Sequence, residues 1–306
     1  MPQITVLMTT YNEDKSVFEN SLKSVLEHTY KDFKILIVVD NSKNIQIIKT
    51  IEYYSKIDSR ISWVVNENNL GLAMSLNKGI DMIDTEYIAR MDADDIADKE
   101  RLEKQICYMQ KHQDVDLIGT NVIYMDNNSN ILYPRAKIPT DYKSIKKVIK
   151  YVNVFHHPTF FGKTSVFKTH KYRNLQYSQD YDLICRLLEN NCKLENIPEY
   201  LLKYRLTAKI NEDKLIKQRI TYYCIQKSYR QGILSKVDIE TEVANELEGT
   251  DKNKVAKSIL YYDEAFIMKK ANKRLKFIKL LFKSFATSKY QRRQIINLLH
   301  YYFINK

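Results

Sequence analysis

The amino-acid sequence predicts an α/β fold with a mostly parallel central sheet and helices on both faces, followed by a helical C-terminal region. Over the first 125 residues, short apolar runs rich in β-branched residues alternate with stretches of helical periodicity. Continuous apolar strands separated by helices are typical of a parallel sheet that is covered on both faces. From about residue 211 onward the pattern is helical, with no convincing strand. We therefore divide the chain into an α/β domain, 1–210, and a helical, basic region, 211–306.

The first half of the α/β domain supplies four strands and three helices. Ile4–Met8 is an apolar run that ends in polar residues, and Lys34–Val39 (KILIVV) is a second run, closed by Asp40. The apolar residues that follow each run recur at helix spacing. The expected elements are strands at 4–8, 34–39, 61–65 and 86–91, and helices at 17–26, 45–57 and 72–83.

The second half of the α/β domain is less regular. We expect Thr140 to cap a helix that runs to Tyr151. An Asn-rich turn at 126–130 follows the fifth strand. The expected elements are helices at 101–112, 140–151 and 180–190, and strands at 116–124, 157–161, 194–197 and 200–205.

Composition excludes several classes of protein. The chain has 306 residues, of which 44% are hydrophobic and 28% charged, so wholesale disorder is excluded. Six glycines and five prolines argue against long flexible linkers and against all-β folds of many hairpins. No run approaches 18 apolar residues, and the N-terminus does not read as a secretory signal. Four widely spaced cysteines favour a reducing, cytoplasmic compartment.

The positive charge of the chain is concentrated at its C-terminal end. Residues 1–251 contain 35 basic and 35 acidic side chains, so their formal charges cancel. Residues 252–306 contain 14 basic and two acidic side chains and carry the entire net charge of +12. A neutral body and a basic tail indicate two different tasks.

An acidic loop is the sharpest chemical feature of the sequence. Asp92, Asp94 and Asp95 follow directly after the buried strand at 86–91. Three carboxylates at a strand end repel one another unless a cation neutralises them, and oxygen ligands suit Mg²⁺ or Mn²⁺. The alternative is a solvated acidic loop at the start of the next helix. In open α/β sheets, however, ligands bind at this edge, which favours a metal site.

The ordered motifs of the chain resemble those of family 2 glycosyltransferases over about residues 3–207. The resemblance implies the GT-A fold, which is Rossmann-like, and a nucleotide-sugar donor. The motifs are Thr9-Thr10-Tyr11-Asn12, Val38-Val39-Asp40-Asn41-Ser42, Asn69-Leu70-Gly71 with Asn77-Lys78-Gly79, Ala89-Arg90-Met91-Asp92-Ala93-Asp94-Asp95, Gln179-Asp180-Tyr181-Asp182-Leu183 and Leu201-Leu202-Lys203-Tyr204-Arg205.

The resemblance assigns roles in donor binding. Tyr11 would stack on the base of the nucleotide, and Asp40 would accept a hydrogen bond from a pyrimidine ring N–H. Asp94 would be a direct metal ligand. Alternative roles are a half-buried aromatic for Tyr11 and a turn residue for Asp40. The full expected set is Asp92 and Asp94 for the metal and Thr9, Tyr11, Asp40, Asn69, Gly71, Asn77, Arg90, Asp92 and His157 for the nucleotide sugar.

The resemblance also supplies a catalytic base, Asp180, which would deprotonate the acceptor hydroxyl. Asp182 is the rival base, and helix capping is the alternative role of Asp180. Gln179 stands where the family usually has Glu. Thr207 stands where the family often has a His that meets the metal or phosphate, so the metal has fewer protein ligands or the tail supplies one.

The implied activity is inverting, metal-dependent and non-processive transfer of a hexosyl group from a UDP-sugar, with Mn²⁺ or Mg²⁺. The expected acceptor is a lipid-linked oligosaccharide of a bacterial capsule, O-antigen or related glycan, with a protein or free sugar as the alternative. Trp63 lies outside any Gln-x-x-Arg-Trp motif of processive synthases. The loop after the first strand lacks the Gly-rich, basic sequence of nucleotidyltransferases. A nucleic-acid binder has no supporting motif here, and a binding protein without transferase activity remains an alternative.

The tail predicts attachment to the cytoplasmic face of a membrane. We expect a helix over 273–286 with an apolar face and a basic face beside it. Aromatic residues at 301–303 suit a membrane interface. The alternative is that the apolar face packs on the catalytic domain. The residues are Phe277, Ile278, Leu281, Phe282 and Phe285 for the apolar face and Lys276, Lys279 and Lys283 for the basic face.

Overall fold

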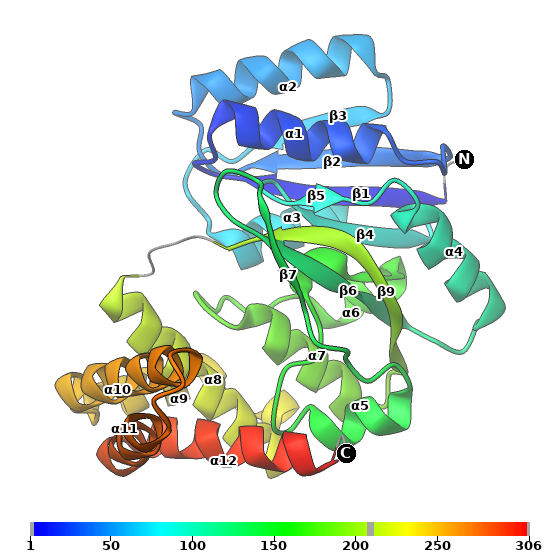
Figure 1. Ribbon diagram of the computed structural model, residues 1–306. Helices are drawn as coiled ribbons and strands as arrows, with labels where there is room; N and C mark the ends of the chain where they lie inside the picture. The colour runs from blue at the N-terminus through cyan, green and yellow to red at the C-terminus, as the bar shows by residue number, and fades with distance from the viewer. Residues whose placement is uncertain (1–2, 207–210, 305–306) are drawn as a thin grey trace. The chain divides into compact units, whose positions relative to one another are not determined.

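The computed structural model describes residues 3–206 and 211–304. The chain divides into two compact units (Figure 1). The first unit comprises residues 1–146 and 154–208, and the second comprises residues 147–153 and 209–306.

The first unit is built on one sheet with the strand order β3-β2-β1-β4-β8-β6-β9-β5, and β7 pairs with β6 (Figure 1). The first four strands in this order are parallel. The remainder is mixed, because β8 pairs antiparallel with β4 and β6, while β6 and β9 are parallel. The strands are β1 (Ile4–Thr10), β2 (Phe33–Val39), β3 (Ile61–Val65), β4 (Tyr87–Asp92), β5 (Ile96–Ala97), β6 (Leu117–Met125), β7 (Ile131–Pro134), β8 (Phe161–Lys163) and β9 (Leu194–Arg205).

Helices cover both faces of the parallel half, as the sequence predicts. Alternate residues of β1 point to opposite faces. One face, which includes Met8, packs against Phe18 of α1 and Ile47 of α2. On the other face α3 lies so close that a Cβ on its Gly79 would come within 2.4 Å of Leu7. The helices of this unit are α1 (Lys15–Leu26), α2 (Ile45–Ile57), α3 (Leu72–Met82), α4 (Arg101–Lys111), α5 (Tyr142–Val148, whose last two residues belong to the second unit), α6 (Thr164–His170) and α7 (Gln179–Glu189).

Three local expectations are wrong. Asp141, and not Thr140, caps α5, because its Oδ1 accepts a hydrogen bond from the Ser144 amide at 3.0 Å. Residues 157–159 form a 3₁₀ turn, so the strand begins only at Phe161. The segments 194–197 and 200–205 form one continuous strand, β9, with an irregular register opposite β6.

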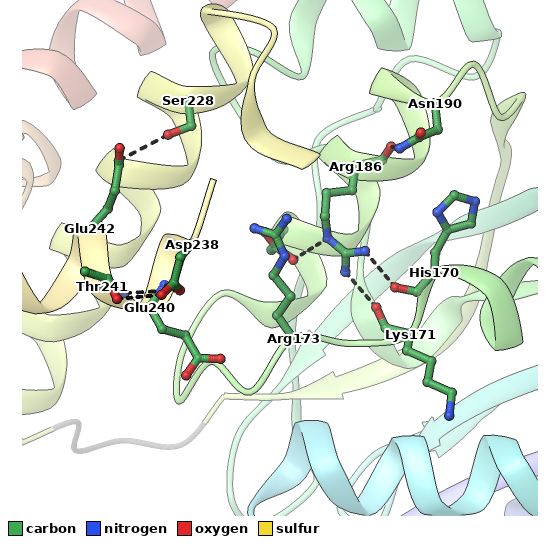
Figure 2. A network of polar contacts seen from close by, with 11 residues as sticks. His170, Lys171, Arg173, Arg186, Asn190, Ser228, Asp238, Glu240, Thr241 and Glu242 are labelled. Carbon is green, nitrogen blue, oxygen red and sulfur yellow. Dashed lines mark hydrogen bonds and ion pairs between the residues drawn. The ribbon is translucent and has the colours of Figure 1, made fainter. Parts of the chain in front are cut away.

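The second unit is helical. Residues 147–153 belong to it because side chains of α8 bind their backbone: Arg230 donates to the Lys150 carbonyl at 2.7 Å, and Gln226 donates to the Tyr151 carbonyl at 2.9 Å. Figure 2 shows two hydrogen bonds elsewhere in this unit. Ser228 of α8 donates to Glu242 of α9, and the Thr241 hydroxyl donates to Asp238 at the start of α9. The helices are α8 (Glu212–Arg230), α9 (Ile239–Glu248), α10 (Lys252–Lys270), α11 (Arg274–Thr287) and α12 (Lys289–Ile304), with a 3₁₀ turn at Leu234–Lys236.

The predicted amphipathic helix is α11, and its apolar face divides into a half-buried part and an exposed part. Phe277, Leu281 and Phe285 are half-buried and form the inner side of the helix. The exposed stripe of α11 consists of Leu275 at 85%, Ile278 at 53% and Phe282 at 69% exposure. The basic row of α11 consists of the exposed Lys276, Lys279 and Lys283.

Candidate active site

The carboxyl ends of β1, β2 and β4 meet at one edge of the sheet, and predicted donor-site residues lie there. Thr9 is in register with Val38 of β2 and with Asp92 of β4. Tyr11 follows β1 and is 43% exposed, whereas Asp40 follows β2 and is buried. The structure brings these residues together at the edge where open α/β sheets bind ligands.

Asp40 holds the loop that leads into α3. Its Oδ1 accepts hydrogen bonds from the Asn66 side chain and from the Leu70 amide, each at 2.8 Å. Its Oδ2 accepts one from the Gly71 amide, also at 2.8 Å. A carboxylate accepts about four hydrogen bonds, so capacity remains for a further donor such as a pyrimidine ring N–H.

The same loop is shaped by Asn69 and Gly71. The Oδ1 atom of Asn69 accepts a hydrogen bond from the Gly71 amide at 2.9 Å. Gly71 has a φ of 77°, a left-handed conformation that glycine adopts without strain. Asn69 is exposed, and therefore the loop presents its side chain at the site edge.

Asn77 lies inside the unit and binds protein backbone. Its Nδ2 donates to the Tyr172 carbonyl at 2.8 Å, and its Oδ1 accepts from the Tyr172 amide at 2.9 Å. The pair of bonds fixes the segment between α6 and α7. The structure thus gives Asn77, which we expected in the nucleotide-sugar site, a contact with the segment that leads to Asp180.

Three carboxylates converge in the loop after β4. Oxygen atoms of Asp92, Asp94 and Asp95 lie within 4.8 Å of one another. Burial, together with the charges of Asp92 and Glu13, raises the pKa of Asp94 to about 7. Burial, together with the charges of Asp92 and Asp94, raises the pKa of Asp95 well above its ordinary value. A bound cation would relieve this repulsion.

The residues of this loop fit a hard divalent cation. Asp92 and Asp94 are half-buried, so each remains accessible from solvent. Asp95 is buried, and its Oδ1 accepts a hydrogen bond from the Arg205 amide at 2.7 Å. Its Oδ2 has no hydrogen-bond partner within residues 3–206 and 211–304. Carboxylate oxygens are the ligands that Mg²⁺ and Mn²⁺ prefer, and Asp95 could serve as a third carboxylate.

Arg90 lies buried beneath the acidic loop and forms an ion pair with Asp92. Burial alone would lower the pKa of Arg90, but the charge of Asp92 and its hydrogen bond raise it above the ordinary value. In the described part of the chain, Nε and Nη1 of Arg90 have no hydrogen-bond partner. The side chain therefore holds Asp92 in place and keeps unused donors near the acidic loop.

Arg205 fastens the acidic loop to the turn between β6 and β7. Its Nε donates to the Asp94 carbonyl at 2.8 Å. Its Nη1 donates to the carbonyls of Asp126 at 2.9 Å and Asn127 at 2.8 Å, and its Nη2 donates to the Ser129 hydroxyl at 2.9 Å. A planar guanidinium with five fixed donors suits this bridging task.

His157 is buried next to Tyr172, and the His157 Nε2 lies 2.9 Å from the Tyr172 hydroxyl. Burial, and then the charge of Arg90, lowers the pKa of His157 well below its ordinary value, so the ring is neutral. Burial raises the pKa of Tyr172, and the charges of Asp180 and Asp92 add to that rise. Tyr172 is thus near both the predicted base and the acidic loop.

The two candidate bases at the start of α7 have different surroundings. Asp182 is fully buried and forms an ion pair with Arg186, with an Oδ2–Nε distance of 2.7 Å. Figure 2 shows Arg186 reaching on to the carbonyls of His170 and Lys171, at 2.7 and 2.6 Å. Asp180 is half-buried on the first turn of the same helix. Asp182 is therefore buried in an ion pair, whereas Asp180 is partly exposed to solvent.

Three residues make contacts at this site although the sequence analysis assigned them no role. They are Glu13, which accepts hydrogen bonds from the Thr10 hydroxyl at 2.6 Å and the Tyr11 amide at 2.7 Å, Tyr172, and Arg205. Arg205 lies in a quoted motif, but its contacts span about 80 to 110 positions of sequence. Short-range patterns carry no signal for contacts of that separation. Thr207, where a family His is often found, lies outside the described residues.

A model of the family described as "Glycosyl transferase family 2" matches residues 5–170, more than half of the chain. The chain belongs to glycosyltransferase family 2. The family and the enzyme class predicted from the ordered motifs are thereby confirmed, and the matched residues include the ends of β1, β2 and β4 and the acidic loop.

Two relatives from Escherichia coli are similar to this glycosyltransferase over most of their length. The O-antigen biosynthesis glycosyltransferase WbnJ is 32% identical over 235 residues, which cover 76% of this chain and 89% of WbnJ. The UDP-Gal:alpha-D-GlcNAc-diphosphoundecaprenol beta-1,3-galactosyltransferase is 27% identical over 208 residues, covering 67% of this chain and 75% of that enzyme. This glycosyltransferase therefore has relatives in polysaccharide synthesis.

A solved structure confirms the predicted fold class. The crystal structure of S. aureus TarS, residues 1–349, in complex with UDP-GlcNAc matches with a TM-score of 0.59 at 16% identity. The match covers 96% of this chain and 89% of that chain. This glycosyltransferase thus has the GT-A fold, with a helical C-terminal region.

Proposed function

We propose that this glycosyltransferase moves a hexosyl group from a UDP-sugar to an acceptor hydroxyl by a single, inverting, metal-dependent displacement, one sugar per encounter. The observation that carries the proposal is the convergence of Asp92, Asp94 and Asp95 within 4.8 Å at the ligand-binding edge of the sheet. A divalent cation would relieve their mutual repulsion, and a departing nucleoside diphosphate needs the same positive charge.

Asp92 and Asp94 would hold a Mn²⁺ or Mg²⁺ ion, which supplies charge neutralisation for the leaving diphosphate. Arg90 fixes Asp92 through its buried ion pair, and Arg205 fixes the Asp94 backbone. Tyr11 and Asp40 would contact the base, and the loop at Asn69 and Gly71 would lie along the ribose and phosphates. These residues therefore orient the donor before chemistry begins.

Asp180 would take the proton of the acceptor hydroxyl while that oxygen attacks the anomeric carbon and the bond to UDP breaks. One displacement inverts the anomeric configuration and forms no covalent intermediate. The accessibility of Asp180 and the engagement of Asp182 with Arg186 support this choice of base. His157 and Tyr172 are uncharged neighbours that would pack against the reacting sugars.

The acceptor we propose is a lipid-linked oligosaccharide of a bacterial capsule, O-antigen or related glycan. The name of one relative states an acceptor of this kind, GlcNAc-diphosphoundecaprenol, and the TarS crystal structure is of a complex with UDP-GlcNAc. A protein or a free sugar is the competing acceptor.

We also propose that α11 places the enzyme at the cytoplasmic face of the membrane. Each lysine of the basic row follows one residue after a member of the exposed stripe, so the two rows lie about 100° apart around the helix. An exposed apolar stripe beside a basic row suits the headgroup plane of an anionic bilayer. Residues 265–306 contain 11 basic side chains and no acidic one. No helix in residues 3–206 or 211–304 is both long and apolar enough to cross a bilayer.

The test of the proposed activity is UDP release from UDP-glucose, UDP-galactose and their N-acetyl forms, with Mn²⁺, Mg²⁺ or a chelator. We expect one donor to be used, faster with acceptor, and no release with chelator. UDP-sugar binding without hydrolysis or transfer under any condition would instead favour a binding protein. Release that is unchanged by chelator would overturn the metal site.

A further inference from the structure

The hairpin of β6 and β7 carries an apolar surface that donor binding leaves unexplained. Among the described residues, β7 pairs with β6 alone. Ile131, Leu132 and Tyr133 are 54%, 47% and 52% exposed, respectively. Tyr133 is opposite Tyr124 of β6 and shares its face, whereas the register shifts at the next position and places Ile131 opposite Met125. Three consecutive large apolar side chains at a strand edge favour a binding role.

The face with Tyr133 continues into an aromatic cluster centred on Tyr124. The ring centroid of Tyr124 lies 5.2 Å from that of Tyr133, 6.3 Å from that of His156 and 6.0 Å from that of Tyr204. Arg135 donates to the Tyr124 hydroxyl at 2.9 Å, which fixes the central ring. Burial raises the pKa of Tyr204, and Asp92 and Asp95 add to the rise, so the cluster ends close to the acidic loop.

Hydrogen bonds from the Arg205 side chain to backbone carbonyls also link the hairpin to the acidic loop. The guanidinium of Arg205 that binds the Asp94 carbonyl also binds the turn at 126–129. One buried side chain therefore sets the position of β7 relative to the loop proposed to hold the donor phosphates. The turn of the hairpin therefore lies next to the loop proposed to hold the donor phosphates.

We propose that the Tyr124 face of the hairpin, formed by Tyr133 and Tyr124, binds the carbohydrate of the acceptor. This inference rests on the proposed function and identifies where its second substrate lies. A half-exposed tyrosine offers a rigid apolar ring and a polar hydroxyl, which match the C–H face and the hydroxyls of a sugar ring. The fixed ring of Tyr124 forms the inner end of this contact.

The chain offers a matched control on the same strand. Tyr133→Ala removes a ring from the proposed surface, whereas Leu132→Ala removes a neighbouring side chain of similar exposure that is not part of the aromatic cluster. Both positions are about half-exposed, so both variants should fold, which a thermal unfolding scan checks. Neither residue touches the acidic loop in any described contact. Donor hydrolysis without acceptor reports the donor site independently.

The experiment measures KM and kcat with saccharides linked to an alkyl diphosphate and with the same free saccharides. We expect Tyr133→Ala to raise the acceptor KM roughly tenfold, with donor KM and hydrolysis unchanged, and Leu132→Ala to stay within twofold.

Equal acceptor KM in Tyr133→Ala and wild type would overturn the inference, as would a wild type that hydrolyses UDP-sugars but uses no saccharide of the set. A wild type that neither hydrolyses nor transfers any UDP-sugar would instead overturn the proposed function. If Tyr133→Ala converts a dimer into a monomer in light scattering at unchanged acceptor KM, the occupant is a second copy of the chain and our assignment is wrong.

Discussion

The two units treat charge in opposite ways. In the first unit, the decisive charges are buried and paired across elements, as Asp92 is with Arg90 and Asp182 with Arg186. In the second unit, the basic row of α11 is exposed, and an exposed apolar stripe accompanies it. The first unit therefore uses the protein interior to fix charges for chemistry, and the second keeps its charges and apolar side chains at the surface for contact with something else.

Because of this difference, substitutions in the two units should have different effects. A buried ion pair loses far more when one partner is removed than an exposed charge does, because an uncompensated charge remains in the interior. Substitutions of these buried charges in the first unit should change turnover or folding, and substitutions on the outer side of α11 should change neither in solution.

The largest expected effect is on turnover, in Asp180→Asn. Loss of a general base lowers kcat roughly 10²- to 10⁴-fold, and binding of UDP in the presence of Mn²⁺ should stay near normal. Steady-state kinetics and titration calorimetry measure the two quantities. Full activity in this variant would mean that another residue is the base.

Asp182→Asn is the matched control two residues along the same helix. It leaves the Arg186 guanidinium buried without its carboxylate, which costs roughly 3–5 kcal/mol of stability. We expect a large fall in Tm, where Asp180→Asn shows little. The reverse pattern, with Asp182→Asn stable and inactive, would assign the base to Asp182.

The next effect concerns the metal. Asp94→Asn should lower kcat/KM roughly a hundredfold or more and weaken the Mn²⁺-dependent binding of UDP, because a direct ligand is lost. Calorimetry with UDP, with and without Mn²⁺, checks this. Undiminished Mn²⁺ dependence would remove Asp94 from the ligand set.

The prediction for the second unit is a change in vesicle binding without a change in soluble catalysis. Each surface cation adds roughly 1 kcal/mol on anionic lipid, so replacing the basic row of α11 by Glu should weaken binding to anionic vesicles at least a hundredfold. UDP release on soluble substrates should stay within twofold. Sedimentation with vesicles at low and high salt measures the binding, which should fall as salt rises.

The control for this experiment replaces three exposed lysines of the first unit. Lys23, Lys56 and Lys99 are exposed, so the same change of charge is made away from α11. If both variants lose vesicle binding equally, net charge and not α11 is responsible. Undiminished binding after loss of the basic row would contradict the membrane proposal.

The smallest expected effect is a gain in stability. The pKa of Asp94 is raised to about 7, so its ionisation opposes folding, and this penalty grows as pH rises from about 4 to about 7. Without metal, Asp94→Asn should therefore have a Tm a few degrees above wild type at pH 7.5, with a smaller difference at pH 5. Thermal scans in chelator measure it. An equal or lower Tm at pH 7.5 would contradict the raised pKa.

The parallel half of the sheet was predictable because its strands are continuous apolar runs closed by polar residues. Two elements, 45–57 and 61–65, have the predicted bounds. Strand β7 was missed because four exposed residues ending in Pro134 have neither a buried run nor an alternation of polar residues. Strand β7 pairs with β6 alone among the described residues, and Arg205 binds the turn between them. The Arg205 contacts join residues that are distant in sequence.

The site was predictable where local sequence determines it, and not where tertiary contacts do. The acidic loop follows β4 directly, so its carboxylates had to lie together. That Asn77 binds the Tyr172 backbone depends on contacts 95 positions apart, which no pattern reveals. The division of the α11 apolar face is of the same kind: periodicity predicts an apolar arc, but not which part of the arc a neighbouring helix covers.

The central claim is a single displacement in which Asp180 takes a proton while the acidic loop holds the departing diphosphate. The most direct test is the anomeric configuration of the new glycosidic bond, read by proton NMR on product made by the wild-type enzyme from an α-linked UDP-sugar. Our account predicts a β-linked product. An α-linked product would contradict it, because net retention cannot arise from one in-line displacement assisted by Asp180.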